Sequence, residues 1–267
     1  MKAKLNNGVE MPMLGLGTWQ LRAEKEAENA VTWALEAGYR HIDTAAYYNN
    51  EESVGKALRN SGLPREEIFV TTKLKNDDHK DPLRAFNTSL RKLDINYIDL
   101  YLIHWPVQSM RNNTWKVFEK LYKEGRCRAI GVSNFTIRHL KELLKVAKIV
   151  PAVNQVEFTP YLYQKELLEF CEKNKIQVEA YSPLTRGKKL KDTKLVEIAK
   201  KYDKTTAQVL LRWALQHDVV VIPKSKTKQR IEENFSVFDF RLSAKDMKKF
   251  DGFNEDLRLC WDPTNVD

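Results

Sequence analysis

The chain has 267 residues, of which 42% are hydrophobic, and it carries a formal net charge of +9. This length suits one α/β barrel, which needs about 250 residues, and the apolar content excludes a disordered chain. The basic residues are spread along the sequence and mixed with Glu and Asp, which excludes a nucleic-acid surface and is compatible with a local site for an anionic ligand.

The sequence shows no membrane segment and no disulfide framework. No stretch reaches the roughly 18 apolar residues of a membrane helix, and residues 1–5 lack the apolar core of a signal peptide. Cys127, Cys171 and Cys260 are widely spaced and form no CxxC pair. We therefore expect a cytoplasmic protein with free thiols, no metal site, and no membrane or nucleic-acid partner.

Turn signals and apolar spacing predict alternating strands and helices in the first half of the chain. Asn6-Asn7-Gly8 lies between two short extended runs, which indicates a β-hairpin at the bottom of a barrel. Residues 14–20 resemble the start of a GxGxxG fingerprint, but Gln20 replaces the third glycine, so we interpret them as the first barrel strand. The next predicted elements are a helix from Ala27 closed by Gly38, a buried strand leading to Asp43, helices at 50–60 and 82–93, and strands at 68–72 and 98–103.

The second half of the chain repeats this alternation. Its predicted helices are 115–123, 140–147, 164–173 and 207–215, and its predicted strands are 129–132, 153–156, 178–181 and 219–222. A further periodic segment covers 195–202, another helix covers 244–250, and the tail at 258–267 has no period. We therefore predict the α/β class and a (β/α)8 TIM barrel with an N-terminal β-hairpin and extra helices in the C-terminal part, folded as a single domain over residues 1–267.

Three successive predicted strands end in groups that can donate or steer protons. Asp43 and Tyr48 follow the second strand, Lys73 ends the third and His104 ends the fourth. Because the chemistry of such barrels collects at the C-terminal ends of the strands, we expect these four side chains at one mouth. Each could separately be structural, but the four together indicate a catalytic site.

The four residues can protonate a carbonyl oxygen. The ammonium of Lys73 would lower the pKa of Tyr48, and Asp43 would keep Lys73 charged. Tyr48 could then act as general acid, while His104 orients the carbonyl and shares its developing charge.

A second enzymatic interpretation makes Lys73 the Schiff-base nucleophile of a barrel aldolase. The later strand ends discriminate between the two, because they offer amide and hydroxyl groups for a carboxamide, the flat ring of Tyr181, and a Lys/Arg cluster at 224–230 before a helix start. That cluster alone could also be a solvated loop. Together these groups favour a dinucleotide site over a sugar-phosphate site.

With these residues identified, the chain resembles the aldo-keto reductases over essentially its whole length. The matching motifs are Gly15-Leu16-Gly17-Thr18-Trp19, Asp43-Thr44-Ala45, Tyr48-Asn49-Asn50-Glu51, Thr72-Lys73-Leu74, Leu102-Ile103-His104-Trp105-Pro106, Gly131-Val132-Ser133-Asn134-Phe135, Gln155, Tyr181-Ser182-Pro183-Leu184, Ile222-Pro223-Lys224-Ser225 and Glu232-Glu233-Asn234. The resemblance implies an oxidoreductase that reduces aldehydes or ketones by hydride transfer from NADPH, with Tyr48 as general acid. The small bacterial-type diketogluconate and methylglyoxal reductases are the most similar members.

The resemblance also implies the cofactor and substrate residues, and a monomeric state. Ser133, Asn134 and Gln155 would hold the nicotinamide carboxamide, with Tyr181 stacked on the ring. The full expected cofactor set is Gly17, Thr18, Trp19, Ser133, Asn134, Gln155, Tyr181, Ser182, Leu184, Lys224, Ser225, Arg230, Glu233 and Asn234, with Lys224, Ser225 and Arg230 on the 2′-phosphate. The expected substrate residues are Trp19, His104 and Trp105, with Trp261 as a further wall.

Some features depart from the family pattern. Lys75 stands where many members have an aromatic residue, and the loop after Trp105 and the tail are both short. We expect an open pocket with a cation at its rim, suited to small or acidic carbonyl compounds. The alternative from another class is an NADP(H)-binding redox-sensing module with little turnover, as in channel-associated relatives.

Overall fold

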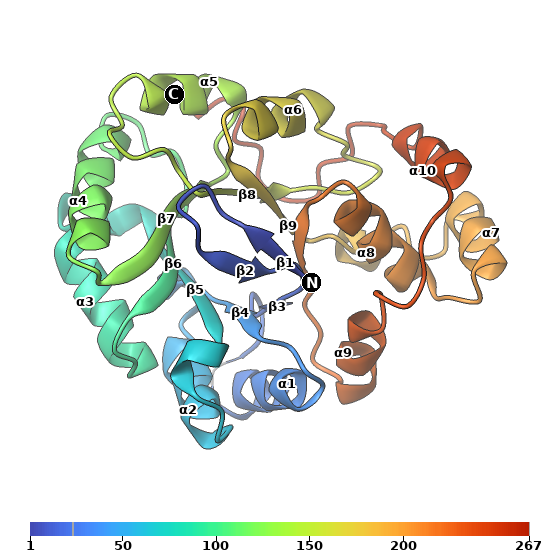
Figure 1. Cartoon of the computed structure of the whole chain (residues 1–267), viewed down its shortest axis with the longest axis horizontal. Coiled ribbons are helices and arrows are strands. Elements are labelled where there is room, and N and C mark those ends of the chain that lie inside the picture. The colour runs from blue at the N-terminus through green and yellow to red at the C-terminus, as the bar shows by residue number, and fades with distance from the viewer. Residues whose placement is uncertain (23, 267) are drawn as a thin grey trace.

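In the computed structural model, which describes residues 1–22 and 24–266, eight parallel strands form a ring with helices outside it (Figure 1). The strands are β3 (Leu16–Gly17), β4 (His41–Asp43), β5 (Phe69–Leu74), β6 (Ile98–Ile103), β7 (Cys127–Ser133), β8 (Val153–Glu157), β9 (Gln177–Tyr181) and β10 (Val220–Ile222). They are hydrogen-bonded in chain order. The ring closes where Leu14 bridges Val221 in parallel and the Gly17 N–H donates to the Pro223 carbonyl over 3.1 Å. The predicted TIM barrel is confirmed.

Amphipathic helices cover the outside of the ring. They are α1 (Lys25–Glu36), α2 (Glu51–Asn60), α3 (Pro82–Leu93), α4 (Arg111–Lys123), α5 (Ile137–Leu144), α6 (Lys165–Lys173), α7 (Thr193–Lys201), α8 (Thr206–Gln216), α9 (Lys228–Phe235) and α10 (Ala244–Asp251). Local sequence sets their starts: Asp81 caps α3 by accepting from the Arg84 N–H, and Thr205 and Gln208 form a capping box on α8. The extra helices are α7, which precedes α8 between β9 and β10, and α10.

Several predicted boundaries differ from the structure, among them those of α4, α5 and α9. Helix α4 begins at Arg111, four residues before the predicted start, because the polar side chains of its first turn hide the apolar period. Helix α5 ends at Leu144, so Ala147 packs against the core from beyond it. Helix α9 begins at Lys228, so the end of the basic cluster lies inside its first turn instead of before it.

The N-terminal hairpin closes one end of the barrel, as the sequence predicts. Strands β1 (Lys2–Lys4) and β2 (Glu10–Pro12) are antiparallel, and Gly8 between them has a φ of 87°. The side-chain amides of Asn6 and Asn7 donate to the carbonyls of Pro151 and Arg128, which lie at the N-terminal ends of β8 and β7. The hairpin crosses the centre of the ring in Figure 1. The C-terminal ends of the strands therefore form the opposite mouth.

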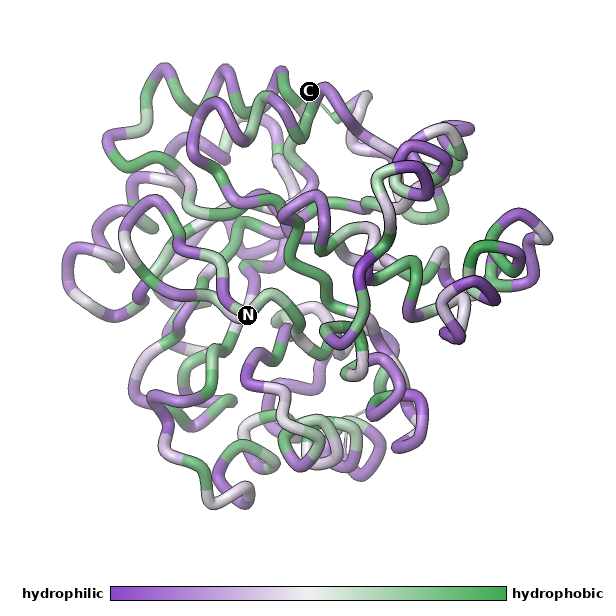
Figure 2. Tube along the Cα trace, turned by 45° about the vertical axis from the view of Figure 1, so that its right-hand side comes forward, coloured by the Kyte–Doolittle hydropathy of each residue, from purple (hydrophilic) through white to green (hydrophobic). Residues whose placement is uncertain are grey.

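The core lies between the strands and the helices. Every residue of β5 and β6 is buried, as expected for parallel strands covered on both faces. Figure 2 shows hydrophobic segments in the interior of the molecule and hydrophilic ones in many outer loops. Among the helices of the described residues, none is long and apolar enough to cross a membrane.

The contact between α2 and α3 gives a stability prediction. Gly55 of α2 packs so closely on α3 that an added Cβ would lie 2.1 Å from the Leu93 carbonyl oxygen. In a free helix Gly→Ala stabilises by roughly 0.5–1 kcal/mol, but overpacking against backbone costs about 1–3 kcal/mol. We expect Gly55→Ala to lower the free energy of unfolding in urea by about 1–2 kcal/mol. Asn60→Ala, at the exposed end of α2, is the control and should not destabilise; a more stable Gly55→Ala protein would contradict this packing.

Candidate active site

The structure brings Asp43, Tyr48 and Lys73 together at the mouth, around a fully buried ammonium. Lys73 Nζ donates to Asp43 Oδ1 over 2.6 Å, to the Thr44 carbonyl over 2.9 Å and to Tyr48 Oη over 3.4 Å. An ammonium has three hydrogens, so these contacts use all of them. Because the Tyr48 hydroxyl accepts from Lys73, its own hydrogen remains available to another acceptor.

A short turn places Tyr48 over the strand ends. Residues Ala46–Tyr48 form the 3₁₀ turn η1 directly after β4, and Asn49 follows in the left-handed region. Asn50 fixes this turn to the neighbouring loop, since its Nδ2 donates to the carbonyls of Thr18 and Leu21 over 3.0 and 3.1 Å. With the turn held in this way, the hydroxyl of Tyr48 lies 3.4 Å from Lys73 Nζ.

Burial controls the protonation of Tyr48. It raises the pKa of Tyr48 well above its usual value, and the charges of Asp43 and of Glu179, when the latter is ionised, add to this effect. The net pKa of Tyr48 is therefore above that of a free tyrosine, and the expectation that Lys73 lowers this pKa stays a prediction. Tyr48 keeps its proton at neutral pH.

His104 lies beside the phenol in a neutral form. Its ring centroid is 5.7 Å from that of Tyr48, with the two planes at 74°. Burial and the charge of Lys73 lower the pKa of His104 to about 3. A neutral imidazole has one N–H donor, so His104 can donate to an oxygen placed between it and Tyr48 without carrying a charge.

The residues predicted to hold the nicotinamide carboxamide form a connected hydrogen-bond network beside the catalytic residues. Ser133 Oγ donates to the Gln155 carbonyl over 2.9 Å, and Tyr181 Oη donates to Asn134 Oδ1 over 2.8 Å. Asn134 has a φ of 63° and also donates from Nδ2 to the His104 carbonyl. The amide hydrogens of Gln155 go to buried carboxylates, which leaves its side-chain oxygen as the group that can meet a ligand.

Cations gather after β9 and β10. Partial burial lowers the pKa of Lys224, and the charges of Lys226 and Arg186 add to this effect. Arg186 belongs to the 3₁₀ turn η4 (Thr185–Gly187), and sequence reasoning did not include it in the site. Arg230 is exposed in the first turn of α9. Positive groups from separate loops that meet in this way suit a phosphate.

The remaining predicted cofactor residues are less directly placed. Glu233 accepts a hydrogen bond from Thr205 Oγ1 over 2.8 Å, so its carboxylate is tied to the start of α8. Gly17 and Thr18 lie at the seam where the barrel closes. The other predicted cofactor residues have contacts within the protein. Ser182 Oγ is 3.6 Å from Cys260 Sγ, and Ser225 Oγ accepts from the Thr227 N–H. Asn234 is buried, and Leu184 packs against the core.

Three indole rings surround the mouth. The ring centroid of Trp19 is 5.7 Å from that of Tyr48, and Trp261 lies 6.0 Å from both Trp19 and Trp105. Trp261 belongs to the tail, which is held because Glu157 accepts from the N–H groups of Leu259 and Cys260. Sequence reasoning missed Glu157; a charged residue within a buried strand was the available signal.

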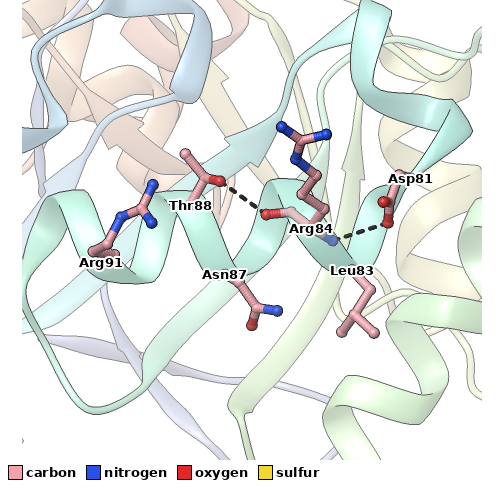
Figure 3. A pocket seen from close by; sticks show the side chains of 6 residues that line it. All are labelled: Asp81, Leu83, Arg84, Asn87, Thr88 and Arg91. Carbon is pink, nitrogen blue, oxygen red and sulfur yellow. Dashed lines mark hydrogen bonds between the residues drawn. The ribbon is translucent and has the colours of Figure 1, made fainter.

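Two surface pockets lie along α3, outside this cluster. One, of about 390 Å³, is lined by Asp81, Leu83, Arg84, Asn87, Thr88 and Arg91 (Figure 3). The other, of about 500 Å³, includes Lys75, whose Nζ is 3.4 Å from Asp77 Oδ2. Neither is lined by the four strand-end residues, and most of their lining is polar. We therefore place the candidate site at the barrel mouth.

Comparison with known proteins agrees with this geometry. Residues 13–255 match the model of the aldo/keto reductase family. The chain is similar to the glyoxal reductase of Bacillus subtilis, with 53% identity over 98% of this chain and 96% of that protein. It is similar in structure to an aldo-keto reductase from a Medee basin deep-sea metagenome library, with a TM-score of 0.96, 50% identity, and 99% of each chain covered.

A second solved structure bears on the cofactor. The Bombyx mori aldo-keto reductase in complex with NADP has a TM-score of 0.90 and 38% identity to this chain, covering 97% of this chain and 94% of that one. The family match covers most of the sequence, and the relatives align along nearly their whole length. The chain therefore belongs to the aldo/keto reductase family of oxidoreductases.

Proposed function

We propose that this protein reduces small aldehydes and ketones to alcohols with NADPH, using Tyr48 as the general acid. The observation that carries the proposal is the use of all three Lys73 hydrogens on Asp43, Thr44 and Tyr48, which leaves the proton of Tyr48 beside a neutral His104. The glyoxal reductase relative supports a small carbonyl substrate, and the NADP complex of a structural relative supports the cofactor.

The donor set at the mouth fits a dinucleotide. The cations of Lys224, Lys226 and Arg186 suit phosphate groups, and Arg230 is exposed in the adjacent helix. The ring of Tyr181 is fixed through its hydroxyl and offers a flat face. NADPH would be held by the loops after β7, β8, β9 and β10, and when bound it supplies hydride to the carbonyl carbon.

The protein's own groups would handle the proton. Tyr48 gives its proton to the carbonyl oxygen, and the phenolate that remains is stabilised by Lys73, which already donates to it. Asp43 holds Lys73 in place, and His104 donates to the same oxygen. Trp19, Trp105 and Trp261 would form the substrate walls that exclude water.

The aldolase interpretation fits the geometry poorly. A Schiff-base lysine needs a neutral amine that can reach a carbonyl carbon. Lys73 is fully buried and its Nζ lies 2.6 Å from a carboxylate oxygen. Its amine is therefore a poor nucleophile, and no observation favours the redox-sensing module over an enzyme.

We also infer that residues 1–267 act as one domain, as a monomer, in the cytoplasm. One continuous sheet of eight strands over the described residues supports the single domain. The monomer and the location stay predictions from the sequence, which size-exclusion chromatography and cell fractionation test.

Removal of the Tyr48 hydroxyl is the first test of the proposed mechanism. We expect Tyr48→Phe to lower kcat for glyoxal by about 100-fold to 10,000-fold, the usual contribution of a positioned general acid. NADPH binding, followed by fluorescence, should stay within about twofold because the ring is kept. Tyr47→Phe is the matched control, since Tyr47 is adjacent and 50% exposed. Equal rates in the parent and in Tyr48→Phe would contradict the assignment.

The cationic cluster gives a prediction on cofactor choice. Arg230→Ala and Lys224→Ala should each raise the KM for NADPH by about tenfold or more and leave that for NADH nearly unchanged, because a charge-assisted hydrogen bond to the 2′-phosphate is lost. Lys228→Ala is the control, since Lys228 is paired with Glu36 at 3.0 Å. A preference for NADPH that survives both test variants would show that the phosphate binds elsewhere.

A further inference from the structure

A second buried carboxylate lies behind the Lys73 cluster and is connected to it by one amide. Gln155 Nε2 donates to Asp43 Oδ2 and to Glu179 Oε2, each over 2.8 Å. Only the nitrogen of an amide can donate to two carboxyl groups, so this contact also fixes the orientation of Gln155. Glu179 is in β9 and fully buried.

The two carboxyl groups differ in their cationic partners. Asp43 has the ammonium of Lys73 at 2.6 Å, whereas the nearest basic group of Glu179 is His41 Nε2 at 3.6 Å from Oε1. Glu179 Oε1 has no hydrogen-bond partner among the described residues. Two buried carboxylates joined by one amide repel each other if both are charged. The charge therefore belongs on Asp43 and the proton on Glu179.

His41 does not supply a counter-charge to Glu179. Burial lowers the pKa of His41 to about 3, so its imidazole is neutral at physiological pH. Its Nε2 also lies 3.2 Å from Thr71 Oγ1. Thr71 is therefore the group that hydrogen-bonds this nitrogen, while Glu179 Oε1 lies beyond hydrogen-bond distance at 3.6 Å.

We propose that Glu179 is a positioning residue of this enzyme that works as a neutral acid, holding Gln155 on Asp43 without adding negative charge beside Lys73. The proposal rests on the reductase function above and deepens it. Burial and the charge of Asp43 raise the pKa of Glu179 to about 8. Above that pH its ionisation would bring a second negative charge near Tyr48, which holds the phenolic proton more tightly and slows proton donation.

The neighbours of Glu179 determine which group could cause such a pH effect. The titratable and charged groups that face it are His41 and Asp43 of β4, Tyr48 of η1 and Lys73 of β5. The two strands next to β9 contribute uncharged groups, which are Gln155 of β8 and the apolar residues of β10. His41 is neutral throughout, and Tyr48 keeps its proton through the mildly alkaline range.

Glu179→Gln is the direct test, because glutamine copies the protonated acid and cannot ionise. Its side-chain oxygen can accept from Gln155 as Glu179 Oε2 does, and its nitrogen would replace Oε1, which has no hydrogen-bond partner among the described residues. We would measure kcat for glyoxal reduction with NADPH from about pH 6 to about pH 10. The parent should lose on the order of tenfold in kcat above about pH 8, and Glu179→Gln should stay within about twofold over the same range.

The control is Glu51→Gln. Glu51 is another buried carboxyl whose pKa is raised by burial, but it faces Thr72, Ser89 and Lys92. This variant should keep the alkaline decline of the parent. An alkaline decline that is unchanged in Glu179→Gln would overturn the proposal.

Unfolding provides a readout that does not depend on activity. The pKa of Glu179 is raised from 4.5 to about 8 on folding, so between these values the native state binds more protons than the unfolded state, and stability falls as pH rises. The melting temperature of Glu179→Gln minus that of the parent should therefore grow with pH across this window, by about 5 °C or more. A constant difference would overturn the protonated assignment. If the parent reduces no carbonyl compound, the reductase proposal fails while this measurement still decides the state of Glu179.

Discussion

The buried ion pair of Lys73 and Asp43 is the interaction on which the site depends. Taking an ammonium and a carboxylate out of water costs several kcal/mol per ion, and only good geometry with further hydrogen bonds offsets it. Here each hydrogen of Lys73 has an acceptor, and both Asp43 oxygens are used, one by Lys73 and one by Gln155. The same hydrogen bonds that offset the desolvation cost of the ion pair also orient Tyr48.

The barrel makes this arrangement possible because it brings the ends of strands that are distant in sequence to one place. The ion pair joins β4 to β5, and Gln155 extends the network to β8 and β9 across the mouth. The N-terminal hairpin occupies the other end of the barrel, so the mouth can be reached from the C-terminal side. The tail then adds Trp261 between the two other indole rings.

The sequence could predict the barrel and its four polar strand ends, because strand and helix periods alternate cleanly, Lys73 ends the strand-like run 69–73, and His104 directly follows the apolar end of another. Three features escaped it. The pKa of Tyr48 depends on how deeply the phenol is buried, which no local pattern reports. Glu179 lies inside a strand, and its role depends on the hydrogen bond that it accepts from the Gln155 amide of the neighbouring strand. Arg186 reaches the cationic cluster through the backbone of an irregular turn.

Single-turnover reduction of glyoxal by NADPH in a Lys73→Met variant tests the role of the buried pair most directly. We predict normal NADPH binding and a hydride-transfer rate at least about 100-fold lower than that of the parent, because the phenolate of Tyr48 loses its cation. Lys73→Met alone leaves the buried carboxylate of Asp43 unpaired, which can unfold the protein. The double variant Asp43→Asn, Lys73→Met removes both charges and is the control for this effect, and circular dichroism checks that each variant is folded. A folded Lys73→Met protein that reduces glyoxal as fast as the parent would contradict the central role of the buried pair.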